Sequence, residues 1–187
     1  MRIAFKEWAI VVDALGRGEQ IIILRKGGIA EGRGGFQVQH PQFWLFPTLF
    51  HQQRGQVVPS AQTRFDEIAP MLSSPDRVRI ELAAEVVAWH RLESLDAAQA
   101  LRGQHIWRDE VIAERFEWGR TKDIFAMAVR ISRLQAPVDL SMVPAYGGCK
   151  SWIELERDIE PSQATPVLTD KDFQLKLGRF RTVTAGG

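Results

Sequence analysis

Cysteine is almost absent from this sequence, because Cys149 is the one thiol among 187 residues. A single cysteine excludes an internal disulfide and a zinc site built from several thiolates. Long apolar runs are also missing, and none approaches the roughly 18 residues that a membrane-spanning helix needs. The first residues, MRIAFKEW, place a Lys–Glu pair where a signal peptide requires apolar residues. We therefore expect a cytoplasmic protein without a membrane partner.

The chain also lacks an excess of charge of one sign. It has 24 Lys and Arg against 23 Asp and Glu, for a net charge of +1. Proteins that bind nucleic acid without specificity usually carry a strong basic field, so any phosphate contact here must come from a local patch. The length predicts one domain. We expect a globular domain over 1–160, with a linker and helix over 161–187 that pack on it or are partly mobile.

Short apolar segments are bounded by glycine and proline. Branched and alternating residues predict strands, and we expect Pro47 and Pro137 to end two of them. Apolar spacing and caps, with Ser94 and Thr169 as N-caps, predict short helices, and residues 182–187 should fray. The expected strands are 21–24, 43–46, 57–59 at an edge, a long bent strand 78–92, 124–134 and 151–155. The expected helices are 61–72, broken near its proline, then 94–103, 108–116 and 170–180.

The N-terminal segment allows two interpretations. Phe5, Trp8, Val12 and Leu15 follow helical spacing, which favours a helix ended by the glycines that follow. The alternative is a strand over 8–15.

The strands and helices do not alternate regularly, which indicates an α+β fold. We expect a mixed or mainly antiparallel sheet with several short helices, and analogy to barrel-like modules suggests closure into a small barrel. The segment FWLF should be an internal strand, with Phe43 and Leu45 on one buried face and Trp44 and Phe46 on the other. Its end should deliver His51 to a cleft beside residues 25–31.

The glycine-rich run at 24–36 is the first candidate site. Successive backbone N–H groups can cradle an anion, and basic side chains would add charge. No Walker or dinucleotide motif is present, and the alternative is a mobile loop with glycines at its turns. The candidate phosphate ligands are Arg25, Lys26, Gly27, Gly28 and Arg33.

Two histidines are candidate general bases. His40 or His51 could work with Glu31 or Glu7. Metal binding would need a third ligand that the spacing does not supply, so we predict no metal, and ordinary hydrogen-bonded histidines are the alternative.

The segment YGGCKSW at 146–152 is the third candidate. Lys150 and Ser151 could contact phosphate. Cys149 has no local base, so we predict a structural or weakly reactive thiol.

Aromatic residues are the fourth candidate. The chain has six tryptophans, and some are interleaved with basic residues in HIWRDEVIAERFEWGRTK. One or two of these rings could stack on a base, and the others should lie in the core.

Five segments in order carry a family resemblance: FKEW, LRKGGIAE, FWLFPTLFHQ, RISRLQAPVDL and YGGCKSW. Through them the sequence resembles the bacterial family Domain of Unknown Function 1802. The reported fusion of members to restriction-endonuclease-type domains implies a module that binds nucleic acid or a nucleotide, with a role in restriction–modification and an endonuclease partner. The resemblance assigns no catalytic residue, and we expect no cofactor. The alternative function is a small hydrolase or transferase that uses His40 or His51 as base, assisted by Glu31 or Cys149.

Overall fold

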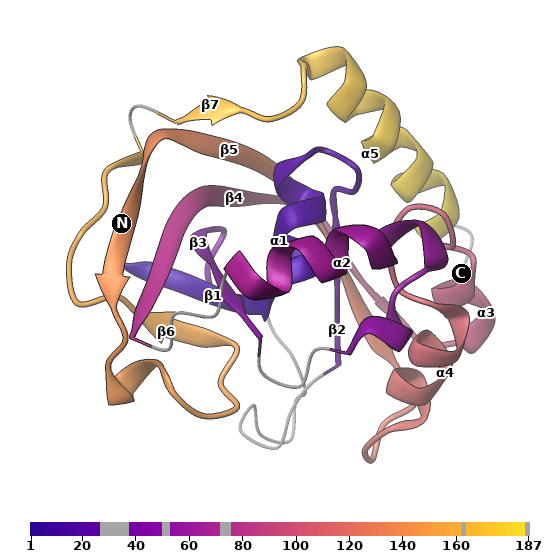
Figure 1. The fold of residues 1–187 in the computed structure, drawn as a ribbon. Coiled ribbons are helices and arrows are strands. Elements are labelled where there is room, and N and C mark those ends of the chain that lie inside the picture. Colours follow the sequence, from indigo (N-terminus) through magenta and orange to yellow (C-terminus); the bar gives the residue numbers. More distant parts are fainter. Residues whose placement is uncertain (27–37, 50–52, 72–75, 162–163, 186–187) are drawn as a thin grey trace.

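One curled sheet organises the molecule (Figure 1). The computed structural model describes residues 1–26, 38–49, 53–71, 76–161 and 164–185. Within these residues, seven strands form a sheet of order β2-β5-β4-β3-β1-β6, and β7 pairs with β5. The elements are β1 (Ile3–Trp8), α1 (Ala9–Gly16), β2 (Ile22–Arg25), β3 (Gln42–Thr48), η2 (Arg54–Gln56), α2 (Pro59–Met71), β4 (Arg77–Leu92), α3 (Leu95–Gln99), α4 (Asp109–Glu117), β5 (Ile124–Ser141), η3 (Pro144–Tyr146), β6 (Trp152–Glu154), β7 (Thr165–Pro166) and α5 (Asp170–Thr184).

The fold is the expected α+β class, with a sheet that curls into a half-barrel. β1 and β3 are parallel, and the other strand pairs are antiparallel. The helices α1 and α2 lie together on one side, and α5 runs along another side of the sheet (Figure 1). None of the helices in the described ranges is long and apolar enough to cross a membrane.

The strand β3 confirms the prediction for FWLF. It lies between β1 and β4 and buries all four side chains. Phe43 and Leu45 join one apolar cluster, whereas Trp44 and Phe46 join a second cluster on the opposite face. Burial on both faces follows from four consecutive apolar residues in an alternating strand.

The expected strand end at Pro47 is wrong. Parallel pairing with β1 continues through Pro47 to Thr48, while pairing with β4 ends at Trp44. At Pro47 one side of β3 is therefore unpaired, and a residue without an N–H is tolerated there.

The long strands β4 and β5 form the bent wall of the half-barrel. The bend in β4 is confirmed, and its register with β5 shifts between Ile80 and Leu82 and again between Val86 and Ala88. Pro137 does not end β5, which runs on to Ser141. It falls within the first shift, between the paired residues Arg133 and Val138, and a bulge is where a sheet accepts proline.

The N-terminal segment contains both of the alternatives. Phe5 and Trp8 belong to β1, and Val12 and Leu15 belong to α1. The predicted helix is therefore correct from Ala9 onward and wrong before it. Helical spacing across these four residues arose from a strand that leads directly into a helix.

The predicted helices are present, but the one expected over 94–103 is helical only over Leu95–Gln99 and continues as turns to Gly103. Ser94 Oγ accepts a hydrogen bond from Ala97 N, and Thr169 Oγ1 accepts one from Asp172 N, as N-caps do. The helix α2 includes Pro70, and α5 extends to the buried Thr184, so the predicted break and the fraying from 182 are wrong there. Residues 57–59 form no strand beyond one bridge from Val57.

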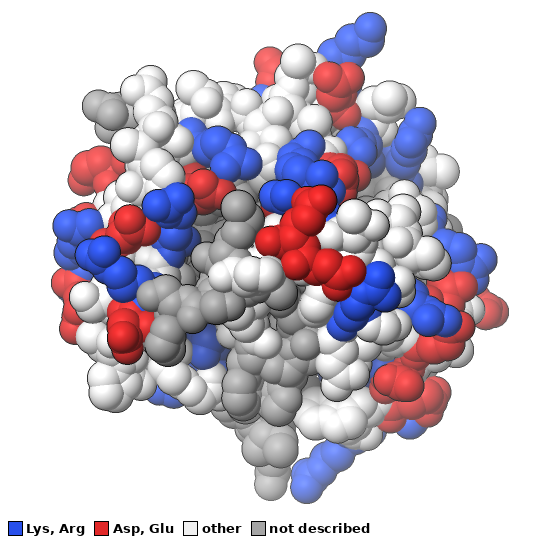
Figure 2. Space-filling model, in the orientation of Figure 1, with Lys and Arg blue, Asp and Glu red and all other residues white. Residues whose placement is uncertain are grey.

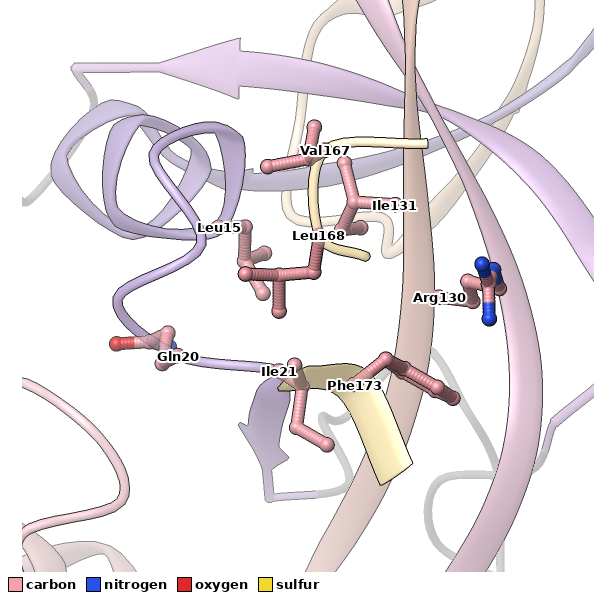
Figure 3. Close-up of a pocket in the computed structure, with 8 residues that line it drawn as sticks. All are labelled: Leu15, Gln20, Ile21, Arg130, Ile131, Val167, Leu168 and Phe173. Carbon is pink, nitrogen blue, oxygen red and sulfur yellow. The ribbon is translucent and has the colours of Figure 1, made fainter. Parts of the chain in front are cut away.

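The C-terminal segment packs closely against the sheet. Phe173, Leu177 and Phe180 of α5 join the main core cluster. A cavity of about 10 Å³ lies between this segment, the end of α1 and β5 (Figure 3). That volume holds at most one water molecule, so this junction is packing and not a ligand site.

Candidate functional site

Half of the predicted site can be placed. Among the candidates, the described residues are Arg25, Lys26, His40, Lys150 and Ser151. The other candidates lie outside the described residues: Gly27, Gly28, Glu31, Arg33 and His51. The expected delivery of His51 to a cleft therefore stays a prediction.

The side chain of Arg25 connects the two edges of the curled sheet. It ends β2, which is one edge of the sheet, and its guanidinium reaches the opposite edge formed by β1 and β6. Its Nη2 donates to the carbonyl of Lys6 at 2.8 Å and to Ser151 Oγ at 3.4 Å. Its Nη1 lies 3.7 Å from the carboxylate of Glu7, which is buried. The structure therefore brings together two predicted residues, Arg25 and Ser151, that are 126 positions apart.

Lys26 is occupied by the protein itself. Its Nζ donates to the carbonyls of Phe116, Thr121 and Asp123 and also to Asp123 Oδ1 at 3.0 Å. The Lys26 side chain is only 7% exposed. Arg91 also pairs with Asp123, so this carboxylate joins the ends of β2 and β4 to the start of β5. Lys26 holds the turn after α4 in place.

Asp123 stays ionised in this network. Burial alone would raise the pKa of Asp123, but hydrogen bonds from Lys26 and Arg91 outweigh burial, and the pKa lies below its ordinary value. A buried carboxylate that accepts from two cations is kept charged by them.

The second predicted loop is held by Lys6. The ammonium of Lys6 donates to the carbonyls of Tyr146 and Gly148, at 2.8 and 2.7 Å. Burial is the main cause that lowers the pKa of Lys6, and a negative charge on Cys149 acts in the opposite direction. Cys149 and Lys150 are exposed on this loop. Lys150 is therefore open to a ligand.

Aromatic rings lie beside the Arg25 contact. Trp152 packs edge-on against Phe5 and Phe43, with ring centroids 4.8 and 5.0 Å away. His40 packs against the same indole at 5.1 Å. This position gives His40 a ring-packing role.

The sequence placed Arg115 only within the run of aromatic and basic residues at 105–122 and did not single it out as a ligand. This half-buried side chain of α4 lies over the ring of Trp107 at 3.8 Å and near that of Trp8 at 5.5 Å. Within the described residues, its guanidinium makes no hydrogen bond or ion pair. Burial lowers the pKa of Arg115 to about 10, the negative charge of Glu7 acts against this, and the positive charge of Arg25 adds to it.

A signal for Arg115 was present in the sequence. The buried residues of α4 include Val111 and Ile112, and Arg115 follows them by four and three positions. Residues at these spacings share one face of a helix. A charged residue on an apolar stripe needs either a partner or a ligand.

Trp107 is itself held by a buried histidine. Nδ1 of His105 accepts a hydrogen bond from the backbone N–H of Trp107 at 3.2 Å. Burial lowers the pKa of His105 to about 4, so the imidazole is neutral at physiological pH. A neutral His105 therefore holds the backbone of Trp107, whose ring carries Arg115.

We call Glu7, Trp8, Arg25, Trp107 and Arg115 the arginine–tryptophan cluster. It contains two guanidinium groups and one buried carboxylate, so it carries a local excess of positive charge. On the face of the molecule that Figure 2 shows, acidic and basic side chains are intermingled. No group of three or more His, Cys, Asp or Glu side chains among the described residues could hold a metal ion. The cluster therefore combines a net positive charge with aromatic rings.

Comparisons with known proteins point to a family and a set of solved structures. The family model "Domain of unknown function (DUF1802)" matches residues 4–178. The crystal structure of ASCH from Zymomonas mobilis is similar at 11% identity and a TM-score of 0.46, covering 94% of this chain and 92% of that chain. A mutant of the same protein is similar at 12% identity and a TM-score of 0.45, covering 94% and 96%. The comparison with curated proteins found no match.

Proposed function

Since the chain belongs to the DUF1802 family, whose description names no activity, we propose from its own residues that it is a nucleotide- or nucleic-acid-binding module. The arginine–tryptophan cluster is the binding site in this proposal. Arg115 binds a phosphate group, and the neighbouring rings provide contacts for a flat base.

The observation that carries this proposal is the guanidinium of Arg115. It is half-buried against two indole rings, and its N–H donors have no hydrogen-bond acceptor among the described residues, although the negative charge of Glu7 acts on it. Desolvated donors without an acceptor are unfavourable. Arginine stacked on an aromatic ring keeps its N–H donors free along the ring edge, where a phosphate can accept two of them.

The surroundings favour a nucleotide over a simple inorganic anion. Trp8 and Trp107 lie edge to face at 4.7 Å; Trp107 is buried, whereas the partly exposed ring of Trp8 offers aromatic surface beside the charge. Stacking on aromatic rings and phosphate contacts by arginine together are typical of single-strand recognition. The buried carboxylate of Glu7 accepts a hydrogen bond from the backbone N–H of Trp8 and lies 3.7 Å from Arg25, so it holds the cluster together from inside.

A binding assay tests the proposal. We expect wild-type protein to bind nucleoside monophosphates or short oligonucleotides in a calorimetric titration. Arg115→Gln should weaken binding at least about tenfold, because a hydrogen bond to a charged group contributes roughly 1.5–3 kcal/mol. The affinity of Arg115→Lys should lie between those of wild type and Arg115→Gln, since an ammonium keeps the charge but cannot form the bidentate contact.

The matched control is Arg108→Gln, which removes the same charge from an exposed arginine. Arg108 stands just before α4 and pairs with Glu110. This control should bind like wild type. Equal affinities of Arg115→Gln and wild type, or no binding of any nucleotide by the wild type, would contradict the proposal.

The proposal extends to an endonuclease partner in restriction–modification, supported by the family resemblance alone. In this arrangement the module recognises nucleic acid and the partner cleaves it. Co-purification of the chain with a restriction-endonuclease-type protein tests this part. The co-purification should depend on Arg115 when nucleic acid is present, and it should not depend on Arg115 when nucleic acid is absent. Cleavage at an unchanged rate and site without this chain would contradict it.

A further inference from the structure

Two tryptophans stand apart from the core. Trp89 and Trp118 are each 52% exposed, whereas Trp44 and Trp107 are buried. A half-exposed indole leaves a large apolar surface in water, which is unusual unless it contacts something. Trp118 belongs to the run of aromatic and basic residues at the end of α4.

The position of Trp118 links it to the binding site proposed above. It caps the C-terminus of α4, and its backbone N–H donates to Glu114 O at 2.9 Å. Trp118 follows Arg115 by three positions and stands just past the end of α4, where the backbone becomes extended. An extended ligand held by Arg115 can therefore continue over the Trp118 ring.

The turn that carries Trp118 is firmly anchored. The buried ammonium of Lys26 donates to the carbonyls of Phe116 and Thr121, on either side of Trp118. Gly119 has a φ of +82°, which other residues rarely adopt, and a Cβ there would lie 3.8 Å from Lys26 Cε. A turn whose backbone is held in this way loses little conformational freedom when a ligand stacks on a side chain that it carries.

We propose that Trp118 is a stacking platform for a base of single-stranded nucleic acid, next to the nucleotide held at Arg115. The inference rests on the proposed function and specifies its ligand. A mononucleotide fills only the Arg115 position, whereas a longer single strand also covers Trp118. Stacking on an aromatic side chain contributes roughly 1–3 kcal/mol per base.

The charges around Trp118 favour a single strand over a duplex. Glu114, Glu117, Arg120 and Lys122 surround this end of α4, and Lys122 pairs with Glu117. These four charges cancel, so phosphate attraction is weak and an exposed base must supply the binding energy. In a duplex the bases are stacked on each other and are not available to the ring.

Calorimetric titrations of the full chain test the inference. The ligands are deoxythymidine monophosphate, a single-stranded deoxythymidylate octamer, the uridylate equivalents, and the octamer annealed to its complement. We expect the octamer to bind wild type at least about tenfold more tightly than the mononucleotide. Trp118→Ala should remove that gain and leave mononucleotide affinity and the free energy of unfolding unchanged.

The matched control is Trp89→Ala, which removes an equally exposed indole from β4. It should keep the octamer gain. The octamer affinity of wild type should fall by less than about tenfold between 50 and 200 mM salt, because each phosphate contact on a single strand contributes a slope of only about 0.7. A steeper dependence would overturn the stacking-dominated mode.

The outcomes separate the two proposals. Mononucleotide binding without an octamer gain overturns the Trp118 inference and leaves the Arg115 site in place. An octamer gain that survives Trp118→Ala, an equal loss in both tryptophan variants, or tighter binding of the duplex also overturns it. An absence of binding to every ligand overturns both.

Discussion

Lys26→Met should lower stability and leave ligand affinity unchanged. Lys26 was a predicted phosphate ligand, yet its Nζ has four acceptors within the protein and its side chain is only 7% exposed. Methionine keeps most of the apolar stem but leaves Asp123 with one cation fewer and three carbonyls without this donor. Its effect therefore distinguishes a structural lysine from a ligand-binding lysine.

The expected magnitude follows from this geometry. Breaking a buried ion pair by removing one partner costs about 3–5 kcal/mol. Asp123 retains Arg91 as a partner, which places Lys26→Met at the lower end, near 3 kcal/mol. Urea unfolding at pH 7 measures the loss as a lower midpoint at an unchanged slope.

The control for this prediction is Lys150→Met. Lys150 is exposed, so its replacement should change the free energy of unfolding by less than about 0.5 kcal/mol. A loss below about 1 kcal/mol for Lys26→Met would refute the structural role. A large loss of nucleotide affinity in the folded Lys26→Met protein would refute the separation of the two roles.

Three further predictions follow from buried and exposed side chains. Phe46→Ala should cost on the order of 3 kcal/mol of unfolding free energy, because Phe46 is 2% exposed and packs on Tyr146; a loss below 1 kcal/mol would count against the second core cluster. Below about pH 6.5 His105 takes up a proton on unfolding, so the free energy of unfolding should stay constant above that pH and fall by about 2 kcal/mol by pH 5. His105→Asn keeps an acceptor for the backbone of Trp107 and should flatten this dependence on pH. An equal dependence in both proteins would disprove the role of His105. Cys149→Ser should leave nucleotide affinity within tenfold, and the exposed thiol should react with a thiol reagent in the folded state; a larger loss at an unchanged melting temperature would show a functional thiol.

Local patterns predicted most of the elements because they depend on neighbouring residues. Four apolar residues in a row identified β3, and alternation identified β4 and the first part of β5. The wrong strand ends at Pro47 and Pro137 have one cause. Whether proline ends a strand depends on the pairing opposite it, and at both positions a hydrogen-bond partner is missing on one side. Pairing register is not encoded near the proline itself.

The candidate site was harder to predict because it forms where the two sheet edges approach each other. Arg25 and Ser151 were both candidates, but only the curl of the sheet brings them within 3.4 Å. The same curl determines which charged side chains already have partners within the protein. Nothing in the glycine-rich segment indicates that Lys26 turns toward the carbonyls after α4.

The contrast between Lys26 and Arg115 gives a physical criterion for a ligand-binding cation. Both are partly or fully removed from bulk water, yet Lys26 has carbonyl and carboxylate acceptors, while among the described residues Arg115 packs on ring faces and feels the charge of Glu7 without a hydrogen bond to it. Acceptors satisfy the donors of a charged group, whereas a ring offers attraction to the charge and no acceptor for its N–H groups. Within the described residues, the protein satisfies the donors of Lys26 but not those of Arg115. Stability should therefore depend on Lys26, and affinity for an anion should depend on Arg115.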